Sequence, residues 1–308
     1  MAREVSRDDI VAAAGRVTPY VRRTPILEVV DPFGGGYDLV LKLEHLQVTG
    51  SFKPRGAFSL LTAMIVPAAG VVAASGGNFG IAVAHAASTL GIPATVFVPE
   101  SSPREKTGRI ADHDADVRIV PGYYDDALAA AREFAAATGA AEAHAYDQLE
   151  VVAGQGTLGR ELAEQTPFDT VVVAVGGGGL IAGVAGWLRD DAIVAAVEPE
   201  LCPSLHAALE AGRPVEVGVG GVAASSLGAR SVGEHTWAVH RFIDHSVLVT
   251  EEAIVTAQKW LWSELRLVVE PAAATTVAAL QTGAYVPLAG SRPVAVLSGG
   301  NVDPATVV

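Results

Sequence analysis

Short apolar runs alternate with alanine-rich stretches along this chain, and the alternation limits the folds open to it. Residues 71–74, 94–100 and 116–120 are rich in β-branched side chains and have the length of buried strands. Residues 79–90 and 125–138 have helical composition. Parallel strands need long crossovers, and helices supply them. The order therefore predicts a parallel sheet covered by helices on both faces.

A second series of the same kind begins at residue 170. TVVVAV (170–175) is a continuous apolar run of the sort found in central parallel strands. Further strands and helices are expected at 180–191, 192–198, 251–265, 271–282 and 293–301. The pattern predicts two α/β units, with a boundary near residues 140–150.

Composition bounds the class of protein. The net charge is −13 and the pI is near 5.0, which argues against nucleic acid as the principal partner because nucleic acid needs a basic face. No apolar stretch approaches the roughly 20 residues that span a membrane, and the N-terminus lacks a signal-peptide hydrophobic stretch. Cys202 is the only cysteine, so no intrachain disulfide can form. We expect a cytoplasmic protein with neither a nucleic-acid nor a membrane partner.

Three glycine-rich segments each follow an expected strand, at 75–78, 176–179 and 298–301. Ligands bind at the carboxyl ends of the strands of an open α/β sheet, so these loops can converge on one site. The four glycines 176–179 allow backbone N–H groups to point inward as an anion nest, and the helix expected after them adds its N-terminal partial charge. This segment therefore predicts a phosphate site, and a simple tight turn would not need four glycines.

A second glycine pattern is a weaker signal. Gly154, Gly156 and Gly159 spell GxGxxG, which alone is poor support for a dinucleotide site. The segment before them is acidic and is no clear strand. The sequence contains neither a GxxxxGK[ST] motif nor metal-spaced His, Cys and carboxylate residues. A nicotinamide oxidoreductase is the alternative that this pattern leaves.

KLEHLQVTGSFKPRGA (42–57) is the most specific string in the chain. It resembles the lysine motif of fold-type II pyridoxal-phosphate (PLP) enzymes, in the version typical of threonine and serine dehydratases and serine racemases. Three further segments agree with that family in order and spacing: ASGGNFG (74–80), VGGGGLIAG (175–183) and LSGGNVD (297–303). VEPAAA (269–274) also resembles the family's glutamate segment. The resemblance covers essentially the whole chain.

The resemblance implies a site and a fold. The fold is α/β, with two doubly wound sheet domains, residues 1–47 plus 145–308 and residues 48–144, and the cofactor in the cleft between them. Lys53 would be the Schiff-base lysine and the catalytic residue. The cofactor would be held by Phe52, Lys53, Asn78, Gly176, Gly177, Gly178, Gly179, Glu270 and Ser298, and the substrate by Ser75, Gly76, Gly77 and Asn78.

The reaction implied is α,β-elimination from L-threonine or L-serine, which releases an α-keto acid and ammonia. Ser298 would offer a hydroxyl to the pyridine nitrogen, which makes the ring a weaker electron sink and suits rapid elimination. Serine racemases carry a second serine where this chain has Gly76, so racemisation is less favoured. Phe79 stands where relatives more often have histidine.

Three questions stay open at the level of sequence. Another β-hydroxy amino acid such as 3-hydroxyaspartate remains a candidate substrate, for which Arg132 and Arg230 are candidate binding residues. Many relatives bind a divalent cation through a glutamate, a backbone carbonyl and an aspartate. Here Glu198 and the Cys202 carbonyl match the first two positions, while Ser204 replaces the aspartate, which would weaken binding of Mg²⁺ or Ca²⁺. The resemblance also implies a homodimer.

Overall fold

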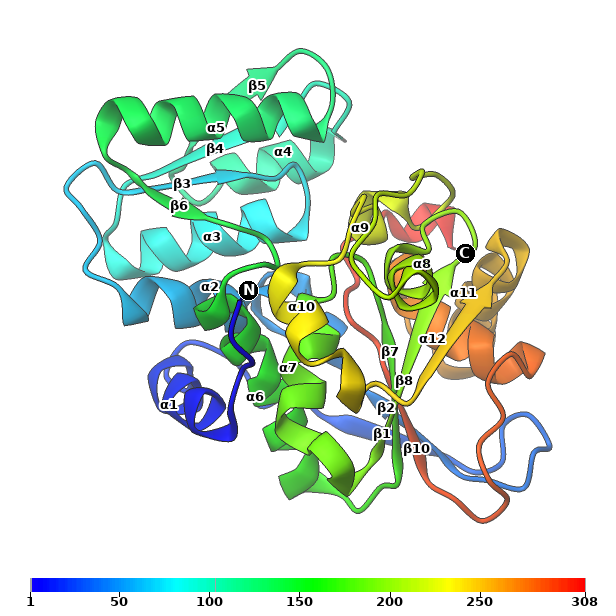
Figure 1. Cartoon of the computed structure of the whole chain (residues 1–308). Coiled ribbons are helices and arrows are strands. Elements are labelled where there is room, and N and C mark those ends of the chain that lie inside the picture. The colour runs from blue at the N-terminus through cyan, green and yellow to red at the C-terminus, as the bar shows by residue number, and fades with distance from the viewer. Residues whose placement is uncertain (1, 103, 308) are drawn as a thin grey trace.

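Two separate β-sheets organise the molecule. A computed structural model describes residues 2–102 and 104–307, and its strands form the two halves seen in Figure 1. The larger sheet has the order β1-β2-β10-β7-β8-β9, and only the β1–β2 pair is antiparallel. Its strands are β1 (Ile26–Val29), β2 (Leu39–Lys42), β7 (Thr170–Ala174), β8 (Ile193–Pro199), β9 (His245–Val249) and β10 (Pro293–Val296).

The smaller sheet is parallel throughout, in the order β5-β4-β3-β6. Its strands are β3 (Val71–Ala74), β4 (Ala94–Pro99), β5 (Asp116–Val120) and β6 (Ala141–Ala143). The expected α/β class with two largely parallel sheets is thereby confirmed. The domain boundaries proposed from the resemblance stay a prediction.

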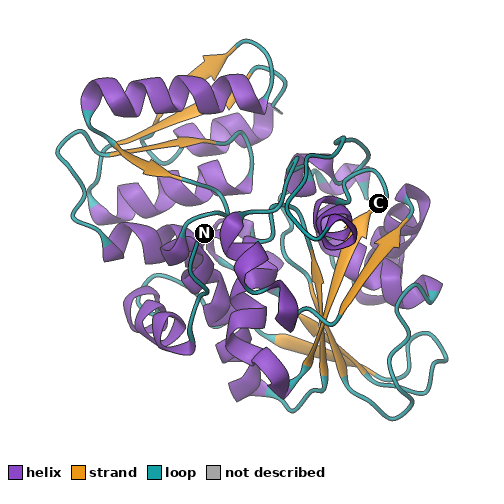
Figure 2. Ribbon diagram, viewed as in Figure 1, coloured by secondary structure: helices purple, strands orange, loops and turns teal. Residues whose placement is uncertain are grey.

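Helices cover both faces of each sheet (Figure 2). Beside the larger sheet, α6 and α7 contribute to one buried core and α11 and α12 to the other, and in the smaller half α3 and α5 lie on opposite faces (Figure 1). The helices are α1 (Arg7–Val17), α2 (Lys53–Ala63), α3 (Asn78–Leu90), α4 (Arg104–Ala111), α5 (Tyr124–Thr138), α6 (Leu149–Gln165), α7 (Gly179–Leu188), α8 (Ser204–Ala211), α9 (Ala224–Leu227), α10 (Glu234–Ala238), α11 (Glu251–Leu265) and α12 (Pro271–Thr282). No helix in the described ranges has the length and apolarity needed to cross a membrane.

The GxGxxG pattern lies inside α6 and serves close helix packing. Gly156 is buried against α7, because a Cβ there would meet the Gly183 carbonyl at 2.9 Å and the Ile10 side chain at 2.7 Å. A Cβ on Gly154 would clash with the Arg55 carbonyl of α2. Since this segment is helical and does not join a strand to a helix, the nicotinamide alternative loses its structural basis.

Each sheet has one point where the order of its strands reverses. In the larger sheet β10 lies on one side of β7 while β8 and β9 continue on the other, and in the smaller sheet β6 and β4 flank β3. Ligands of open α/β sheets bind at such points, beyond the carboxyl ends of the strands. The glycine loops after β7, β10 and β3 all begin there.

Candidate active site

Lys53 is placed at the reversal point of the larger sheet by a set of backbone contacts. It is the first residue of α2, with Pro54 in the first turn, where proline is favoured. Just before it, Ser51 pairs with Gly299, and the Phe52 N–H donates to the Ser298 carbonyl at 3.0 Å. The segment that carries the lysine is therefore fixed to the loop that follows β10.

The Lys53 amine lies near two aromatic rings and a backbone carbonyl. Its Nζ is 5.0 Å from the centroid of the Phe52 ring and 5.6 Å from that of Phe79, and it donates to the Ala145 carbonyl at 3.0 Å. Burial lowers the pKa of Lys53 to about 8, although the Glu270 carboxylate opposes that shift. A neutral amine is thus accessible near physiological pH, as a nucleophile or a base requires.

The glycine loop after β7 is shaped by close neighbours. A Cβ on Gly177 would clash with the Tyr146 ring, and Gly178 has φ +89° and faces Thr236. The Gly177 carbonyl accepts from the Gly233 N–H at 3.0 Å and from Thr236 Oγ1 at 3.2 Å. Among the residues that the structure describes, no side chain caps the N-terminus of α7. The helix end is left with free N–H groups, as an anion site needs.

The loop after β3 brings a second uncapped helix N-terminus to the same region. Ser75, Gly76 and Gly77 precede α3, whose N-cap Gly77 provides no side chain, and the Gly77 N–H donates to Ser75 Oγ at 3.3 Å. A Cβ on Gly76 would clash with Ser102. The loop can receive a carboxylate through its backbone.

Glu270 joins the two halves of the molecule beside Lys53. It is buried at the start of α12, and its Oε2 accepts from Asn78 Nδ2 at 2.6 Å. Its Oε1 accepts from Lys106 Nζ at 2.9 Å and from Ser226 Oγ at 3.3 Å. Glu270 and Asn78, both named from the resemblance, are therefore in direct contact.

Asn78 is held from its other side as well. Its Oδ1 accepts from Asn301 Nδ2 at 2.7 Å, and Asn301 Oδ1 accepts from the Arg109 guanidinium. Lys106 and Arg109 lie three residues apart on one face of α4. The amide of Asn78 is consequently fixed in orientation by Glu270 and Asn301 of the larger half. Lys106 and Arg109 of α4 hold these two partners in turn.

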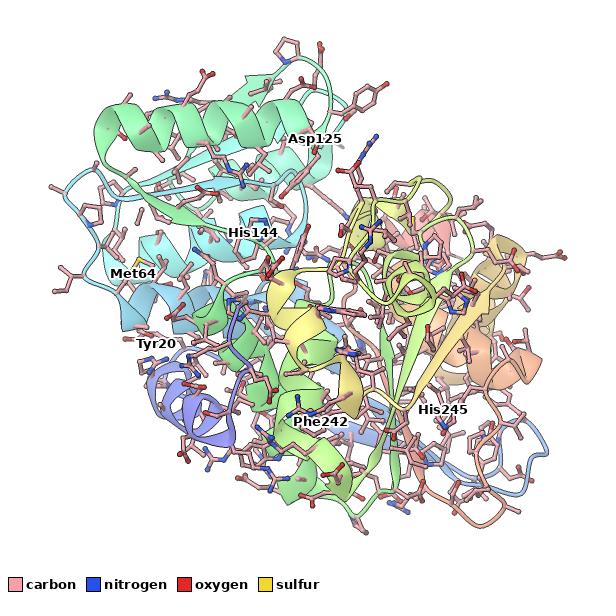
Figure 3. The ribbon with its side chains drawn as sticks, viewed as in Figure 1. Tyr20, Met64, Asp125, His144, Phe242 and His245 are labelled. Atoms are coloured by element: carbon pink, nitrogen blue, oxygen red, sulfur yellow. The ribbon has the colours of Figure 1, made fainter. Side chains whose placement is uncertain are left out.

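Sequence reasoning missed several residues of this site. Lys106 and Arg109 carry no motif, and only their i, i+3 spacing on a helix next to a glycine loop could have drawn attention to them. Tyr146 follows β6, the short strand at the second reversal point, and His144 in the same loop lies on the smaller half in Figure 3. The site is thus completed by long-range contacts that local patterns do not encode.

Arg132 and Arg230, the candidates for an acidic substrate, both pair with carboxylates at exposed positions. Arg132 Nε is 3.5 Å from Glu142 Oε1, and Arg230 Nε is 3.8 Å from Asp125 Oδ2. These carboxylates lie outside the glycine loops, in β6 and α5. Lys106 and Arg109, by contrast, are basic residues whose side chains do bond to site residues.

The candidate cation position, formed by Glu198, Cys202 and Ser204, is occupied by hydrogen bonds within the protein. Glu198, at the end of β8, is fully buried and accepts from the N–H groups of Leu205 and His206, both at 2.7 Å. Ser204 Oγ lies 3.2 Å from Glu198 Oε1 and donates to the Gly176 carbonyl at 2.7 Å. Burial raises the pKa of Glu198 to about 7. The Cys202 thiol donates to the Gly220 carbonyl at 3.0 Å.

These residues together fit pyridoxal phosphate. A half-buried lysine of lowered pKa suits its aldehyde, and a glycine cradle at a free helix N-terminus suits its phosphate. Ser298, whose side chain has no hydrogen-bond partner in the described ranges, suits its pyridine nitrogen. The fold and the site define a class: an α/β enzyme that holds a phosphorylated cofactor through a lysine.

Comparison with known proteins agrees with this class. The model of the family "pyridoxal-phosphate dependent enzyme" matches residues 17–299. An L-threonine ammonia-lyase from Geobacter sulfurreducens is 39% identical over 88% of this chain and 69% of its own length. The crystal structure of a T.th. threonine deaminase superposes with a TM-score of 0.90 at 38% identity, over 97% of this chain and 99% of its own. Maize serine racemase gives a TM-score of 0.93 at 31% identity, over 100% and 96%. The chain belongs to the threonine/serine dehydratase family of fold-type II PLP enzymes.

Proposed function

We propose that this chain is a threonine/serine ammonia-lyase, which converts L-threonine to 2-oxobutanoate and ammonia, or L-serine to pyruvate and ammonia. The observation that carries the proposal is the Lys53 amine, whose pKa is lowered to about 8 where the glycine loops of both sheets meet. The names of the relatives, threonine ammonia-lyase and threonine deaminase, support the same substrate class.

Each group of residues has a separate role in the proposed elimination reaction. When bound, PLP supplies a carbonyl for the substrate amine and a conjugated ring that acidifies the Cα–H bond. Lys53, as a neutral amine, removes the proton from Cα. The N-terminus of α3 and the loop from Ser75 to Gly77 bind the substrate carboxylate through backbone N–H groups. The β-hydroxyl leaves with a proton as water, which balances the proton removed from Cα. The enamine product tautomerises to an imine, and a second water hydrolyses that imine to the keto acid and ammonia.

The position of Asn78 suits binding of the cofactor's ring hydroxyl. Its Nδ2 has two N–H groups, and Glu270 uses only one of them. The second is available because Asn301 holds the amide from its oxygen side. The rings of Phe52 and Phe79 lie beside the Lys53 amine, where burial favours its neutral form over the charged one.

Gly76 argues against racemisation as the main activity. A racemase needs an acid or base on the second face of Cα, and glycine has no side chain for this role. The space that a side chain at this position would enter is taken by Ser102. Elimination therefore remains the reaction that these residues serve best. A dehydratase for 3-hydroxyaspartate is the alternative within the family.

The test is release of α-keto acid from L-threonine, L-serine and 3-hydroxyaspartate by the PLP-loaded protein. We expect turnover of L-threonine or L-serine that disappears in Lys53→Ala, whereas Lys259→Ala, an exposed lysine, keeps it. Turnover of 3-hydroxyaspartate alone would establish the alternative. No keto acid from any of the three, from a protein that carries PLP, would overturn the proposal.

We also propose that the enzyme is a cytoplasmic homodimer. Its acidic composition and single buried cysteine suit a reducing compartment, and the family resemblance supports the dimer. Light scattering coupled to gel filtration measures the assembly, and a mass near twice 31.6 kDa is the expected result. A mass of one chain would contradict it.

A further inference from the structure

The four-glycine loop needs its carbonyl groups held on one side so that its N–H groups face the other. In a planar trans peptide the C=O and the following N–H point in opposite directions. The Gly177 carbonyl is held by Gly233 and Thr236, which directs the Gly178 N–H away from them. The Gly176 carbonyl has a different partner, the Ser204 hydroxyl at 2.7 Å.

Ser204 is in turn fixed by the surroundings of Glu198. Both residues are fully buried, and Ser204 is the first residue of α8. The two oxygens of Glu198 accept the N–H groups of Leu205 and His206, which satisfies the free end of that helix. Ser204 Oγ then lies between Glu198 Oε1, at 3.2 Å, and the Gly176 carbonyl.

This arrangement does not fit the divalent cation that the family resemblance implies. Mg²⁺ and Ca²⁺ need several oxygen ligands, with carboxylates among them. Of the three residues at the position, only Glu198 carries a carboxylate, and both of its oxygens already accept backbone hydrogen bonds. No group of three His, Cys, Asp or Glu side chains suited to a metal occurs in the described ranges.

We propose that Ser204 is a positioning residue that does the work of a cation in this chain: its hydroxyl anchors the Gly176 carbonyl and so aims the Gly177 N–H at the cofactor phosphate. The consequence is an enzyme whose hold on PLP is independent of divalent cations. This inference rests on the proposed function only in taking PLP as the cofactor.

The experiment measures the Kd for PLP by visible absorbance, with Mg²⁺ in millimolar excess and with EDTA. Wild-type protein should give the same Kd in both conditions. Ser204→Ala should raise the Kd about tenfold in both, as expected for a lost hydrogen bond. Ser204→Thr, which keeps the hydroxyl, should restore tight binding, and Ser263→Ala, at an exposed serine of α11, should change nothing.

Ser204→Asp provides the sharpest comparison. The second carboxylate next to Glu198 should weaken PLP binding in EDTA and restore it with Mg²⁺. A wild-type Kd that depends on Mg²⁺, an unaltered Kd in Ser204→Ala, or a Ser204→Asp protein without a Mg²⁺ response would each overturn the inference. Circular dichroism checks that the variants are folded. Because the measurement is cofactor affinity, a failure of threonine turnover would leave its result interpretable.

Discussion

At Lys53 the demands of folding and of chemistry oppose each other. The half-buried Lys53 amine, with a pKa near 8, costs stability when it is protonated, because the unfolded chain holds the same proton with a pKa near 10.5. The same shift makes the neutral amine available for catalysis. A residue of this kind is expected at a functional site, where local stability is given up for reactivity.

Replacing this lysine should therefore stabilise the cofactor-free protein. We expect Lys53→Met to raise the free energy of unfolding at pH 7 by up to about 3 kcal/mol, from the pKa difference. The unfolded state binds more protons than the folded one between pH 8 and 10.5, so wild-type stability rises with pH across that window and the advantage of the variant shrinks.

Urea denaturation of the cofactor-free proteins from pH 7 to pH 10 measures this effect. Lys259→Met, at an exposed position of α11, retains Lys53 and should therefore show the same change of stability with pH as the wild type. An advantage of Lys53→Met that is absent, or that grows with pH, would contradict the lowered pKa.

The candidate site residues that belong to sequence motifs could be predicted from sequence. Those that reach the site only through tertiary contacts could not. Lys53, Asn78, Ser298 and the four glycines stand in strings whose order is specific. Lys106 is a lone lysine on a polar helix, and nothing local indicates that it meets Glu270, 164 residues further along the chain. Its role depends on how the two sheets are placed, which periodicity does not describe.

At the scale of elements, α4 connects the smaller sheet to the larger one through a buried ion pair. We expect Lys106→Met to destabilise the protein by about 3–5 kcal/mol, since it leaves the Glu270 carboxylate buried without its cation. The double variant Lys106→Met/Glu270→Gln should recover most of this loss, because no unpaired charge remains.

Urea denaturation of the wild type, the single variant and the double variant gives the free energies of unfolding to compare. Arg132→Ala, which breaks an exposed ion pair with Glu142, is the matched control and should cost less than about 1 kcal/mol. If Lys106→Met costs no more than the control, then the buried pair is not formed in solution.

The close approach of helices α6 and α7 requires glycine where their backbones meet. A Cβ on Gly183 would clash with the backbone of Gly156 and Val152 in the facing helix. We expect Gly183→Ala to lower stability by several kcal/mol, because backbone cannot move aside as a flexible side chain can. Thermal unfolding measures it.

Gly15→Ala in α1 is the control for this substitution. An added Cβ there meets nothing within 4 Å, so the change should stabilise the protein by about 0.5–1 kcal/mol through helix propensity. Equal changes in stability for Gly183→Ala and Gly15→Ala would show that α6 and α7 are not in close backbone contact.

Secondary structure was predictable where apolar runs were long and periodic. The helices at 251–265 and 271–282 and the strand at 116–120 coincide with the expected ranges. The β1–β2 hairpin, α1, α6 and β9 were not anticipated. The hairpin is short, and α6 carries three glycines and several polar residues, so its helical state depends on burial against its neighbours rather than on propensity.

At the scale of the whole molecule, the two sheets place their reversal points against each other. Lys53 follows the larger sheet's β2 and contacts Ala145 beyond β6 of the smaller one, while Asn78 beyond β3 contacts Glu270 of the larger half. Asp125 of α5, labelled in Figure 3, adds an exposed ion pair with Arg230 across the same junction. The site is therefore complete only when both halves are in place.

The central claim is that Lys53 is the residue that holds PLP. The chain has four lysines, so reduction of the PLP-loaded protein with borohydride, followed by peptide mass spectrometry, gives a direct answer. The account predicts the pyridoxyl group on Lys53 alone. A pyridoxyl group on Lys42, Lys106 or Lys259, or none on a protein that retains visible PLP absorbance, would contradict it.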